Sequence, residues 1–400
     1  MNVLAGVRPV RALAPALLAL LLVAACSAPP PPQAAPARPD CPTSSDAAAD
    51  LFPDKPTATR STNFTLTYHR SYAVLTVAQP YPGAAPESYV LLRCGAQAPE
   101  LPADLADAQR IETPVRSLYA ESTTQLPLLV DIGALDVLTG VGTPDFVSGP
   151  QVRAEIDAGG VRGFSDSGAI ETEKVITAAP DVLLSQGTDN PAFPALRNAG
   201  VPVIGWAEYL DAGPLGKAEW IKVMGVLTGR EAEAEQTFDA IARRYDALVA
   251  TTAGLTPTPV ALGGIYQGTW SVPTGGSATG ALVRDAGGTW SEVANTGPGA
   301  VQKDFEGVYT TDGAAPVWLA TGTFATMADV HAADARYGEL AAVRSGRVWT
   351  PDKRIGPTGG NDFHERGVTH PEEILADLIA VLHPEALPGH EFVYYRQVPA

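Results

Sequence analysis

Apolar residues recur with a helical period between residues 228 and 254. One stripe of them follows alternating spacings of four and three: Ala234, Phe238, Ile241, Tyr245 and Leu248. This spacing puts the stripe on one face of a helix. Thr228 and Glu231 stand three residues apart, as the partners of a capping box do, and Gly254 is a typical residue at a helix end. The pattern predicts a single helix of about 24 residues and roughly 36 Å, with Thr228 as its N-cap.

Shorter apolar runs lie upstream of this helix. Residues 41–112 contain three runs that alternate like strands, at 64–68, 72–77 and 89–92. Prolines and a glycine between the last two runs indicate a turn. This part of the chain is expected to form a small antiparallel β element.

Strand-like and helix-like runs alternate from residue 114 onward. In the first half, strands are expected at 115–119, 137–141, 182–185 and 201–204. One helix is expected directly after Ser122 to Thr124, and two more are expected at 171–177 and 194–200. In the second half, strands are expected at 260–266, 317–320 and 348–349, and helices at 278–286, 305–310 and 371–382. Such alternation with short links predicts a parallel sheet covered by helices.

The second half also repeats a pattern of the first. Glu173-Lys174-Val175, which precedes one buried run, corresponds to Glu306-Gly307-Val308, which precedes another. We therefore predict an α/β fold in which two Rossmann-like lobes are joined by one long backbone helix. The lobes span 113–227 and 255–400, and the helix spans 228–254. The alternative is an ordinary surface helix in one large domain.

Residues 1–26 have the pattern of an export signal. Arg8 and Arg11 precede an apolar run, 13–25, that is too short to argue for a membrane-spanning helix. Leu22-Val23-Ala24-Ala25-Cys26 resembles the lipobox of bacterial lipoproteins, in which the Cys is lipidated and becomes the N-terminus. The alternative is a plain secretory signal with a chance Cys. Residues 27–40 are rich in Pro and Ala and are expected to be a disordered tether.

These features predict an extracytoplasmic protein, lipid-anchored to the cell membrane, in the periplasm or at the outer face of the cytoplasmic membrane. Cys41 and Cys94 are then the only pair of cysteines left in an oxidising compartment, and we predict a disulfide between them. The alternative is two unrelated thiols.

Charge and motifs exclude several classes of function. The formal net charge of −17 excludes general binding of nucleic acid. The segment 213–218 lacks the glycine spacing of a P-loop, and His364 and His370 are six apart rather than the four of a zinc-protease helix. No metal-ligand set and no catalytic constellation is recognised, which favours a binding protein over an enzyme.

Aromatic and polar residues gather at predicted strand ends, where open parallel sheets bind ligands. We predict a cleft between the lobes with these ligand-binding residues: Trp206, Tyr209, Tyr266, Trp270, Trp290, Arg354, Phe363 and His364. Arg354 and Lys353 would pair with anionic oxygens of a negatively charged ligand. The alternative for each aromatic residue is a packing role.

Two segments carry a family resemblance. Residues 214–222 (PLGKAEWIK) and 361–385, with the runs NDFHERGV and PEEILADLI, resemble the substrate-binding lipoproteins of ABC importers for iron–siderophore complexes. They belong to a helical-backbone group that also includes cobalamin and haem binders, and the similarity extends from about residue 50 to the end. Related sequences usually carry Tyr-Trp in place of Phe363-His364.

The resemblance implies an extracytoplasmic monomer that captures a ferric siderophore or similar metal chelate and delivers it to an ABC permease. The chelator would fill the metal's coordination sphere, so neither a protein metal ligand nor a resident cofactor is expected. It also implies docking to permease subunits through one Glu on each lobe, here Glu173 and Glu306. Alternatives are a cobalamin or haem binder, a secreted two-lobed hydrolase, and a cell-surface interaction protein with an empty cleft.

Overall fold

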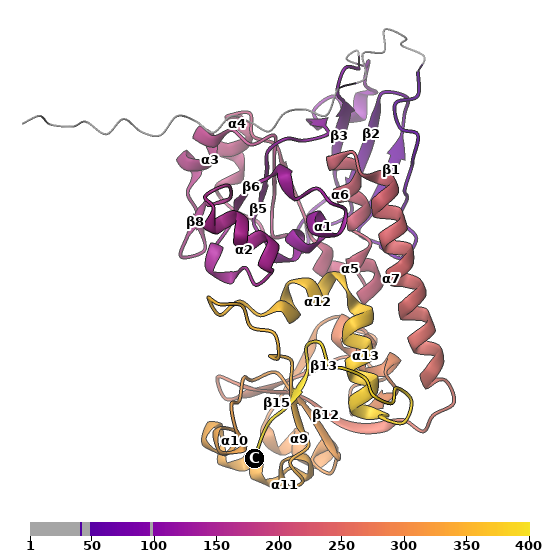
Figure 1. Ribbon diagram of the computed structural model, residues 1–400, viewed down its shortest axis with the longest axis vertical. Helices are drawn as coiled ribbons and strands as arrows, with labels where there is room; N and C mark the ends of the chain where they lie inside the picture. Colours follow the sequence, from indigo (N-terminus) through magenta and orange to yellow (C-terminus); the bar gives the residue numbers. More distant parts are fainter. Residues whose placement is uncertain (1–40, 42–48, 97–98) are drawn as a thin grey trace, which may run out of the picture. The chain divides into compact units, whose positions relative to one another are not determined.

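The computed structural model describes residue 41, residues 49–96 and residues 99–400. The predicted signal, the tether and the lipidation site Cys26 lie outside the described residues. In the part that is described, no helix combines the length and the apolar character needed to cross a membrane. The described chain contains an N-terminal β element, two α/β lobes and a long helix (Figure 1).

The N-terminal element is a four-stranded sheet in the order β1-β2-β3-β4. Its strands are β1 (Phe64–Tyr68), β2 (Tyr72–Val77), β3 (Glu87–Arg93) and β4 (Gln109–Thr113). β1, β2 and β3 pair antiparallel, as predicted, but β3 and β4 pair parallel. The expectation of a purely antiparallel element is therefore wrong. The cause is the long connection 94–108, which includes the turn η1 (Ala103–Leu105) and lets β4 return in the direction of β3.

The predicted disulfide between Cys41 and Cys94 is confirmed. The two Cα atoms lie 5.5 Å apart, and the cysteines are 53 residues apart in the sequence. Cys94 directly follows β3, so the bond ties the beginning of the described chain to the sheet.

Two buried carboxylates fix the segment 59–63 to the first lobe. The Glu219 carboxylate accepts hydrogen bonds from the backbone N–H groups of residues 59, 60 and 61 at 2.6–2.8 Å and from Lys222 Nζ at 2.8 Å. The Asp211 carboxylate accepts from the N–H groups of residues 62 and 63 and from Trp220 Nε1. Part of the run 214–222 thus has a structural task, which is to hold the N-terminal element.

The first lobe contains a five-stranded sheet in the order β11-β10-β5-β6-β7, and every neighbouring pair is parallel, as predicted. The strands are β5 (Leu118–Ala120), β6 (Leu138–Val141), β7 (Arg162–Gly163), β10 (Val182–Leu184) and β11 (Val203–Ile204); a small hairpin adds β8 (Ser165–Asp166) and β9 (Ala169–Ile170). Its helices are α1 (Leu126–Asp131), α2 (Pro150–Asp157), α3 (Thr172–Ala178) and α4 (Phe193–Asn198), with the turns η2 (Thr123–Gln125), η3 (Leu135–Val137), η4 (Pro144–Phe146) and η5 (Glu208–Leu210).

Three helices lead out of this lobe: α5 (Pro214–Ala218), α6 (Ile221–Thr228) and α7 (Glu231–Thr252). α7 is the predicted long helix, and its apolar stripe is buried as expected. Thr228, however, ends α6 instead of capping α7. Its hydroxyl donates to the Met224 carbonyl at 2.8 Å, and Gly229 adopts a left-handed conformation with φ 69°. Glu231 is not a capping residue either, because its carboxylate forms an ion pair with Arg93.

The second lobe contains a mixed sheet in the order β15-β13-β12-β16-β17-β18, with β14 also paired to β12. The strands are β12 (Thr258–Tyr266), β13 (Thr269–Pro273), β14 (Gly288–Thr289), β15 (Ala300–Lys303), β16 (Val317–Ala320), β17 (Val348–Thr350) and β18 (Arg396–Gln397). The helices are α8 (Ala278–Asp285), α9 (Phe305–Asp312), α10 (Met327–Ala333), α11 (Ala341–Arg344), α12 (Arg366–Thr369) and α13 (Pro371–Leu382), with the turns η6 (Ala335–Glu339) and η7 (Asp362–His364). α7 runs beside α6 and α13 (Figure 1).

The expectation of a parallel sheet holds only for part of the second lobe. β12 pairs parallel with β14 and β16 but antiparallel with β13. Gln267 and Gly268 connect β12 to β13 with φ values of 50° and 84°, which is the geometry of a tight hairpin turn between twisted strands. The predicted ligand-binding residues Tyr266 and Trp270 therefore belong to a hairpin.

Candidate functional site

A pocket of about 360 Å³ lies at the carboxyl ends of β5, β6 and β10 in the first lobe. The strand order of the sheet reverses at β5, with β6 on one side and β10 on the other, and open parallel sheets bind ligands at such a point. A loop of the second lobe completes the wall. The lining residues are Ala120, Glu121, Ser122, Thr123, Leu126, Val141, Gly142, Thr143, Phe146, Ser165, Gly168, Gln186, Gly359, Gly360, Asn361 and His364.

The strand ends come close together beneath the pocket. A Cβ atom on Gly142 would lie 2.6 Å from the Glu121 carbonyl oxygen, so only glycine allows this approach. Ser122 then caps the turn η2: its side chain accepts from the Thr124 N–H, and the Gln125 side chain accepts from the Ser122 N–H in return. This capping box fixes the chain where it turns along the pocket wall.

Glu121 brings a carboxylate into the pocket. Its side chain is half-buried, and its Oε2 accepts the backbone N–H of Gln186 at 2.9 Å. Burial raises the pKa of Glu121 above the usual value for a glutamate, although the bond from Gln186 opposes this shift. One hydrogen bond leaves a carboxylate able to accept several more.

A chain of hydroxyl groups begins at Ser122 and ends at a buried acid. The Thr124 hydroxyl donates to Glu208 Oε1 at 2.7 Å, and Ser122 Oγ lies 2.9 Å from the same Thr124 oxygen. A hydroxyl has one proton, so Ser122 must be the donor in its contact with Thr124. Ser122 consequently has one acceptor lone pair left, because the other accepts the Thr124 N–H.

His364 comes from the second lobe. It lies at the end of η7, where its exposed ring packs edge-on against Phe363 at 5.1 Å. The protein atoms around its inner side lower the pKa of His364 through desolvation, so the ring is neutral at pH 7. Asn361 lies in the same loop, and Glu121 with His364 are the two ionisable side chains among the described lining residues.

The loop of the second lobe fits closely onto the first lobe. A Cβ atom on Gly360 would lie 2.2 Å from the Phe146 carbonyl oxygen, and one on Gly356 would lie 2.9 Å from the Ser148 Cα. Glycine at these two positions thus allows the two backbones to touch. Phe146 keeps 66% of its surface exposed beside this contact.

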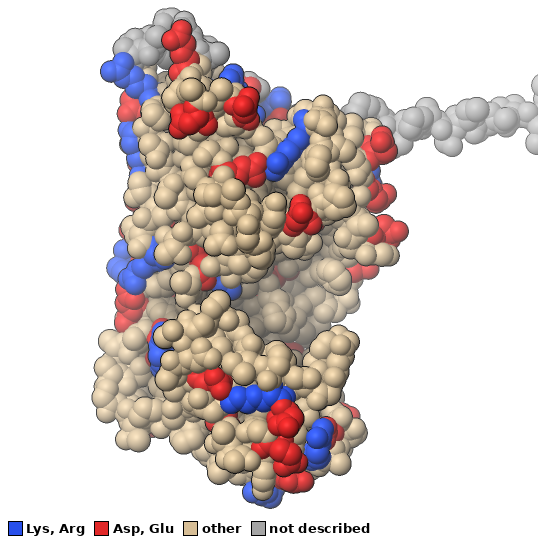
Figure 2. All heavy atoms as spheres, turned by 180° about the vertical axis from the view of Figure 1, so that it is seen from behind, with Lys and Arg blue, Asp and Glu red and all other residues tan. Residues whose placement is uncertain are grey.

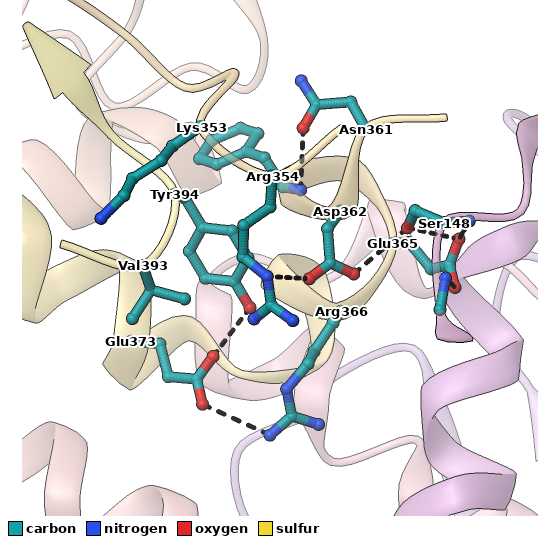
Figure 3. A network of polar contacts seen from close by, with 12 residues as sticks. Ser148, Lys353, Arg354, Asn361, Asp362, Glu365, Arg366, Glu373, Val393 and Tyr394 are labelled. Carbon is teal, nitrogen blue, oxygen red and sulfur yellow. Dashed lines mark hydrogen bonds and ion pairs between the residues drawn. The ribbon is translucent and has the colours of Figure 1, made fainter. Parts of the chain in front are cut away.

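Glu365 links the two lobes at the beginning of α2 (Figure 3). Its carboxylate accepts the backbone N–H groups of Ser148 at 2.7 Å and Gly149 at 2.9 Å, and also the Ser148 hydroxyl at 2.9 Å. The Ser148 hydroxyl also contacts Asp362 at 3.2 Å. These N–H groups stand directly before Pro150, the first residue of α2, so a carboxylate of one lobe holds the chain that leads into a helix of the other.

A second link joins α12 to α1. Arg366 and His370 both contact the Asp131 carboxylate, at 3.0 and 2.7 Å. Burial disfavours the charged imidazole, but hydrogen bonds to Asp131 and Glu372 outweigh it and raise the pKa of His370 to about 9. His370, Glu372 and Glu373 could gather around a metal ion, yet both ring nitrogens are already bonded and Arg366 already pairs with Glu373. The His370 ring and Glu373 are therefore already engaged within the protein.

Three of the predicted ligand-binding aromatics are buried in the cores, so the prediction that they line the cleft is wrong. Trp206 and Trp270 have no exposed surface, and Trp290 is 5% exposed. Trp206 packs against Trp220 at 4.8 Å. The indole N–H of Trp270 donates to the Leu262 carbonyl, and that of Trp290 donates to a carbonyl of β13. A strand end marks the place of a binding site but does not decide which face a side chain occupies.

The other predicted ligand-binding residues have mixed positions. His364 lines the pocket, and Phe363 beside it is half-buried against Tyr394 and Tyr395. Tyr209 is 40% exposed and donates to the carbonyl of Gly187, the neighbour of the lining residue Gln186. Tyr266 is 76% exposed at the hairpin. Their contact with a ligand stays a prediction.

The predicted cations are engaged elsewhere. Arg354 Nε lies 3.2 Å from Asp362 Oδ2, and Lys353 Nζ donates to the Phe392 carbonyl. In Figure 3 the Lys353 side chain extends away from Ser148 and Asn361. Neither residue lines the pocket.

Sequence reasoning missed Glu121 and Phe146 as lining residues. Glu121 directly follows a buried strand, which is the signal that could have identified it. Phe146 stands between two turn-forming segments and contacts the loop around Gly360, which is distant in the sequence. No local pattern marks it as a lining residue. The expected docking residues Glu173 and Glu306 are both exposed, in the first turns of α3 and α9.

Comparison with known proteins places the chain in a family. The sequence profile described as "Periplasmic binding protein" matches residues 118–355, which is more than half of the chain. An uncharacterized lipoprotein of Methanocaldococcus jannaschii is 26% identical over 232 residues; the match covers 56% of this chain and 54% of that protein. The chain therefore spans about half the length of this curated relative.

Solved structures of low sequence identity share the fold. A possible iron-binding, periplasmic solute-binding protein from Staphylococcus epidermidis has 17% identity and a TM-score of 0.54, covering 67% of this chain and 99% of that one. A periplasmic heme-binding protein from Pseudomonas aeruginosa has 20% identity and a TM-score of 0.52, covering 72% of this chain and 99% of that one. The predicted two-lobed α/β fold is thereby confirmed. The chain belongs to the periplasmic binding protein family.

Proposed function

We propose that this protein captures a ferric siderophore or a similar metal chelate outside the cytoplasm and delivers it to an ABC permease. The observation that carries the proposal is the pocket at the sheet's reversal point, which residues of both lobes line. A ligand held there contacts two lobes at once, so the loaded and empty forms of the protein can present different surfaces to a permease.

The similar proteins support a metal complex as the ligand. The two structures with the same fold are described as heme-binding and as possible iron-binding proteins. Cobalamin and haem are therefore the alternative ligands. Family membership favours binding over the alternative of a secreted hydrolase, because the family consists of substrate-binding proteins.

The proposed location is the extracytoplasmic face of the membrane, with a lipid on Cys26 as the anchor. Its support is the lipobox-like segment that ends at Cys26 and the description of the curated relative as a lipoprotein. Mass spectrometry of the protein from its native membrane tests this directly. A diacylated N-terminal Cys26 is expected, and an intact residue 1 or an unmodified Cys26 would contradict the anchor.

Intrinsic fluorescence offers the first test of the ligand class. The chain has six Trp residues, so a coloured complex within the pocket is expected to quench their emission. The purified chain would be titrated with ferric siderophores of several chemical types, haem and cyanocobalamin. Saturable quenching with a Kd in the micromolar range or below supports the proposal. A folded protein that binds none of these complexes would contradict it.

We propose Glu173 and Glu306 as the docking residues for the permease. Each is an exposed carboxylate in the first turn of a helix, and the two belong to different lobes. Each also interacts favourably with its own helix dipole, by about 0.3–1 kcal/mol, and the two roles are compatible. Exposed charges of this kind act mainly by steering and pairing with a partner.

Double charge reversal, Glu173→Arg with Glu306→Arg, should leave ligand affinity unchanged and reduce uptake strongly. A matched control reverses one exposed carboxylate on each lobe away from these helices, Glu155 on α2 and Glu385 after α13. Uptake of the labelled complex is measured at equal expression. Normal uptake by the Glu173/Glu306 variant, or an equal loss in the control, would remove the docking role.

A further inference from the structure

The charges that line the pocket are unevenly distributed. Among the described lining residues there is one carboxylate, Glu121, one imidazole, His364, and no Lys or Arg. The imidazole is neutral at pH 7, because desolvation lowers the pKa of His364. Figure 2 shows a hollow midway along one face of the molecule, and the atoms around it are mostly neither basic nor acidic. The charge inside the pocket is therefore negative.

Arg354 and Lys353, the cations that were expected near the ligand, do not neutralise this negative charge. Arg354 is paired with Asp362, and the other Asp362 oxygen contacts the Ser148 hydroxyl, so this carboxylate is held in place between the lobes (Figure 3). The Lys353 ammonium group donates to the Phe392 carbonyl, on the side away from Ser148 (Figure 3). These two residues therefore add no positive charge to the pocket lining, and their pairing with a negatively charged ligand stays a prediction.

Two hydrogen-bonding groups of the first lobe, Glu121 and Ser122, favour a ligand with hydrogen-bond donors or positive charge. Glu121 offers carboxylate oxygens, and Ser122 offers one lone pair, because its proton is used toward Thr124 and its other lone pair accepts the Thr124 N–H. A ligand group that contacts these two side chains needs hydrogen-bond donors or a positive charge, whereas Thr143 and Gln186 can either donate or accept. An anion placed here would meet like charge in a half-buried site, where screening by water is weak.

We propose that the pocket selects a metal complex of net positive charge, with Glu121 as its counter-charge. This inference rests on the proposed function, since it specifies the ligand class for the same site. Electrostatic attraction over a few ångströms in a half-buried site corresponds to about tenfold or more in affinity per unit charge. The preference should disappear when the carboxylate is replaced by its neutral amide.

A series of complexes with one metal-binding core separates charge from shape. Ferrioxamine B is a ferric trihydroxamate with a free ammonium group and one net positive charge; N-acetylation makes it neutral, and N-succinylation makes it negative. The panel also includes haem, ferric tris-catecholate and cyanocobalamin. Each is titrated against the wild-type chain, Glu121→Gln and a control, Glu155→Gln. The control removes the same charge from an exposed position on α2 of the same lobe.

We expect the cationic trihydroxamate to be the tightest binder of the panel, at least about tenfold tighter than its anionic form. Glu121→Gln should reduce this ratio to within about threefold, with an unchanged Tm, whereas Glu155→Gln should preserve it. A neutral or anionic complex as the tightest binder would overturn the inference and leave the proposed function standing. A charge preference that persists in Glu121→Gln would also overturn it. If no complex of the panel binds to the folded chain, the proposed function and the inference fail together.

Discussion

Trp270 shows how an aromatic residue at a strand end can be interpreted in two ways. The chain Thr269-Trp270-Ser271-Val272 alternates polar and apolar residues, and in β13 the apolar members are buried while the polar members are half-exposed. Side chains of a strand alternate between faces, so this pattern already indicated an inward Trp270. The aromatic character of Trp270 suggests a ligand contact, but the alternation within the strand outweighs that suggestion. The ring packs against Trp318 and Tyr337 at 5.6 and 5.5 Å.

Replacing Trp270 with Ala should destabilise the protein, because it leaves a cavity and removes the hydrogen bond to Leu262. We expect a loss of about 3–5 kcal/mol in the free energy of unfolding, measured by urea denaturation. Tyr266→Ala, four residues away in the same hairpin but 76% exposed, is the control and should change stability by less than about 0.5 kcal/mol. Equal stability of the two variants would show that Trp270 is not a core residue.

At the scale of elements, the apolar periods predicted most helices and strands, and they failed where an element meets a distant part of the chain. β1, β2, β16 and α13 begin and end at the predicted residues. The start of α7 does not, because Glu231 pairs with Arg93 in the β element instead of capping its own helix. Glu219 is a similar case: its partners lie about 160 residues away, and no local pattern contains that information.

Glu219→Ala should weaken the attachment of the N-terminal element. Three backbone N–H groups and the buried Lys222 would lose their common acceptor, which costs about 3–5 kcal/mol for a buried charge left without its partner. Hydrogen bonds outweigh burial and lower the pKa of Glu219, so the carboxylate stabilises the fold at neutral pH and this contribution is lost on acidification.

Thermal unfolding at pH 7, and in a series of pH values from 4.5 downward where the lowered pKa of Glu219 makes the loss appear, measures both effects. The control is Glu233→Ala on the exposed face of α7, for which we expect less than about 0.5 kcal/mol. A Glu219→Ala variant as stable as the control at pH 7 would argue against the role of this carboxylate as a clamp.

For the whole molecule, the sequence rhythm and the internal repeat predicted two α/β lobes and their connecting helix. These two patterns did not predict the contacts between the lobes. Glu365 and Arg366 stand in a segment that was recognised by family resemblance, yet the resemblance does not say that Glu365 binds the chain before α2 or that Arg366 binds Asp131. Such pairs depend on how two surfaces meet, and a periodic pattern describes only one surface at a time.

Glu365→Ala should loosen the contact between the lobes. The Ser148 and Gly149 N–H groups would lose their acceptor, and hydrogen exchange at these amides is expected to accelerate by about 100-fold at constant global stability. Glu391→Ala, at an exposed position of the same lobe, is the control. Unchanged protection at both amides would show that the lobes are held together by other contacts.

The Cys41–Cys94 bond also determines how force enters the molecule. Tension applied to the chain at residue 41 reaches the end of β3 directly through the sulfur atoms, without first passing along the backbone from residue 49 onward. β3 is paired with β2 on one side and β4 on the other, so two ladders share the load. A pull on the N-terminal side therefore enters the molecule at the β element, in the middle of its sheet rather than at a free chain end.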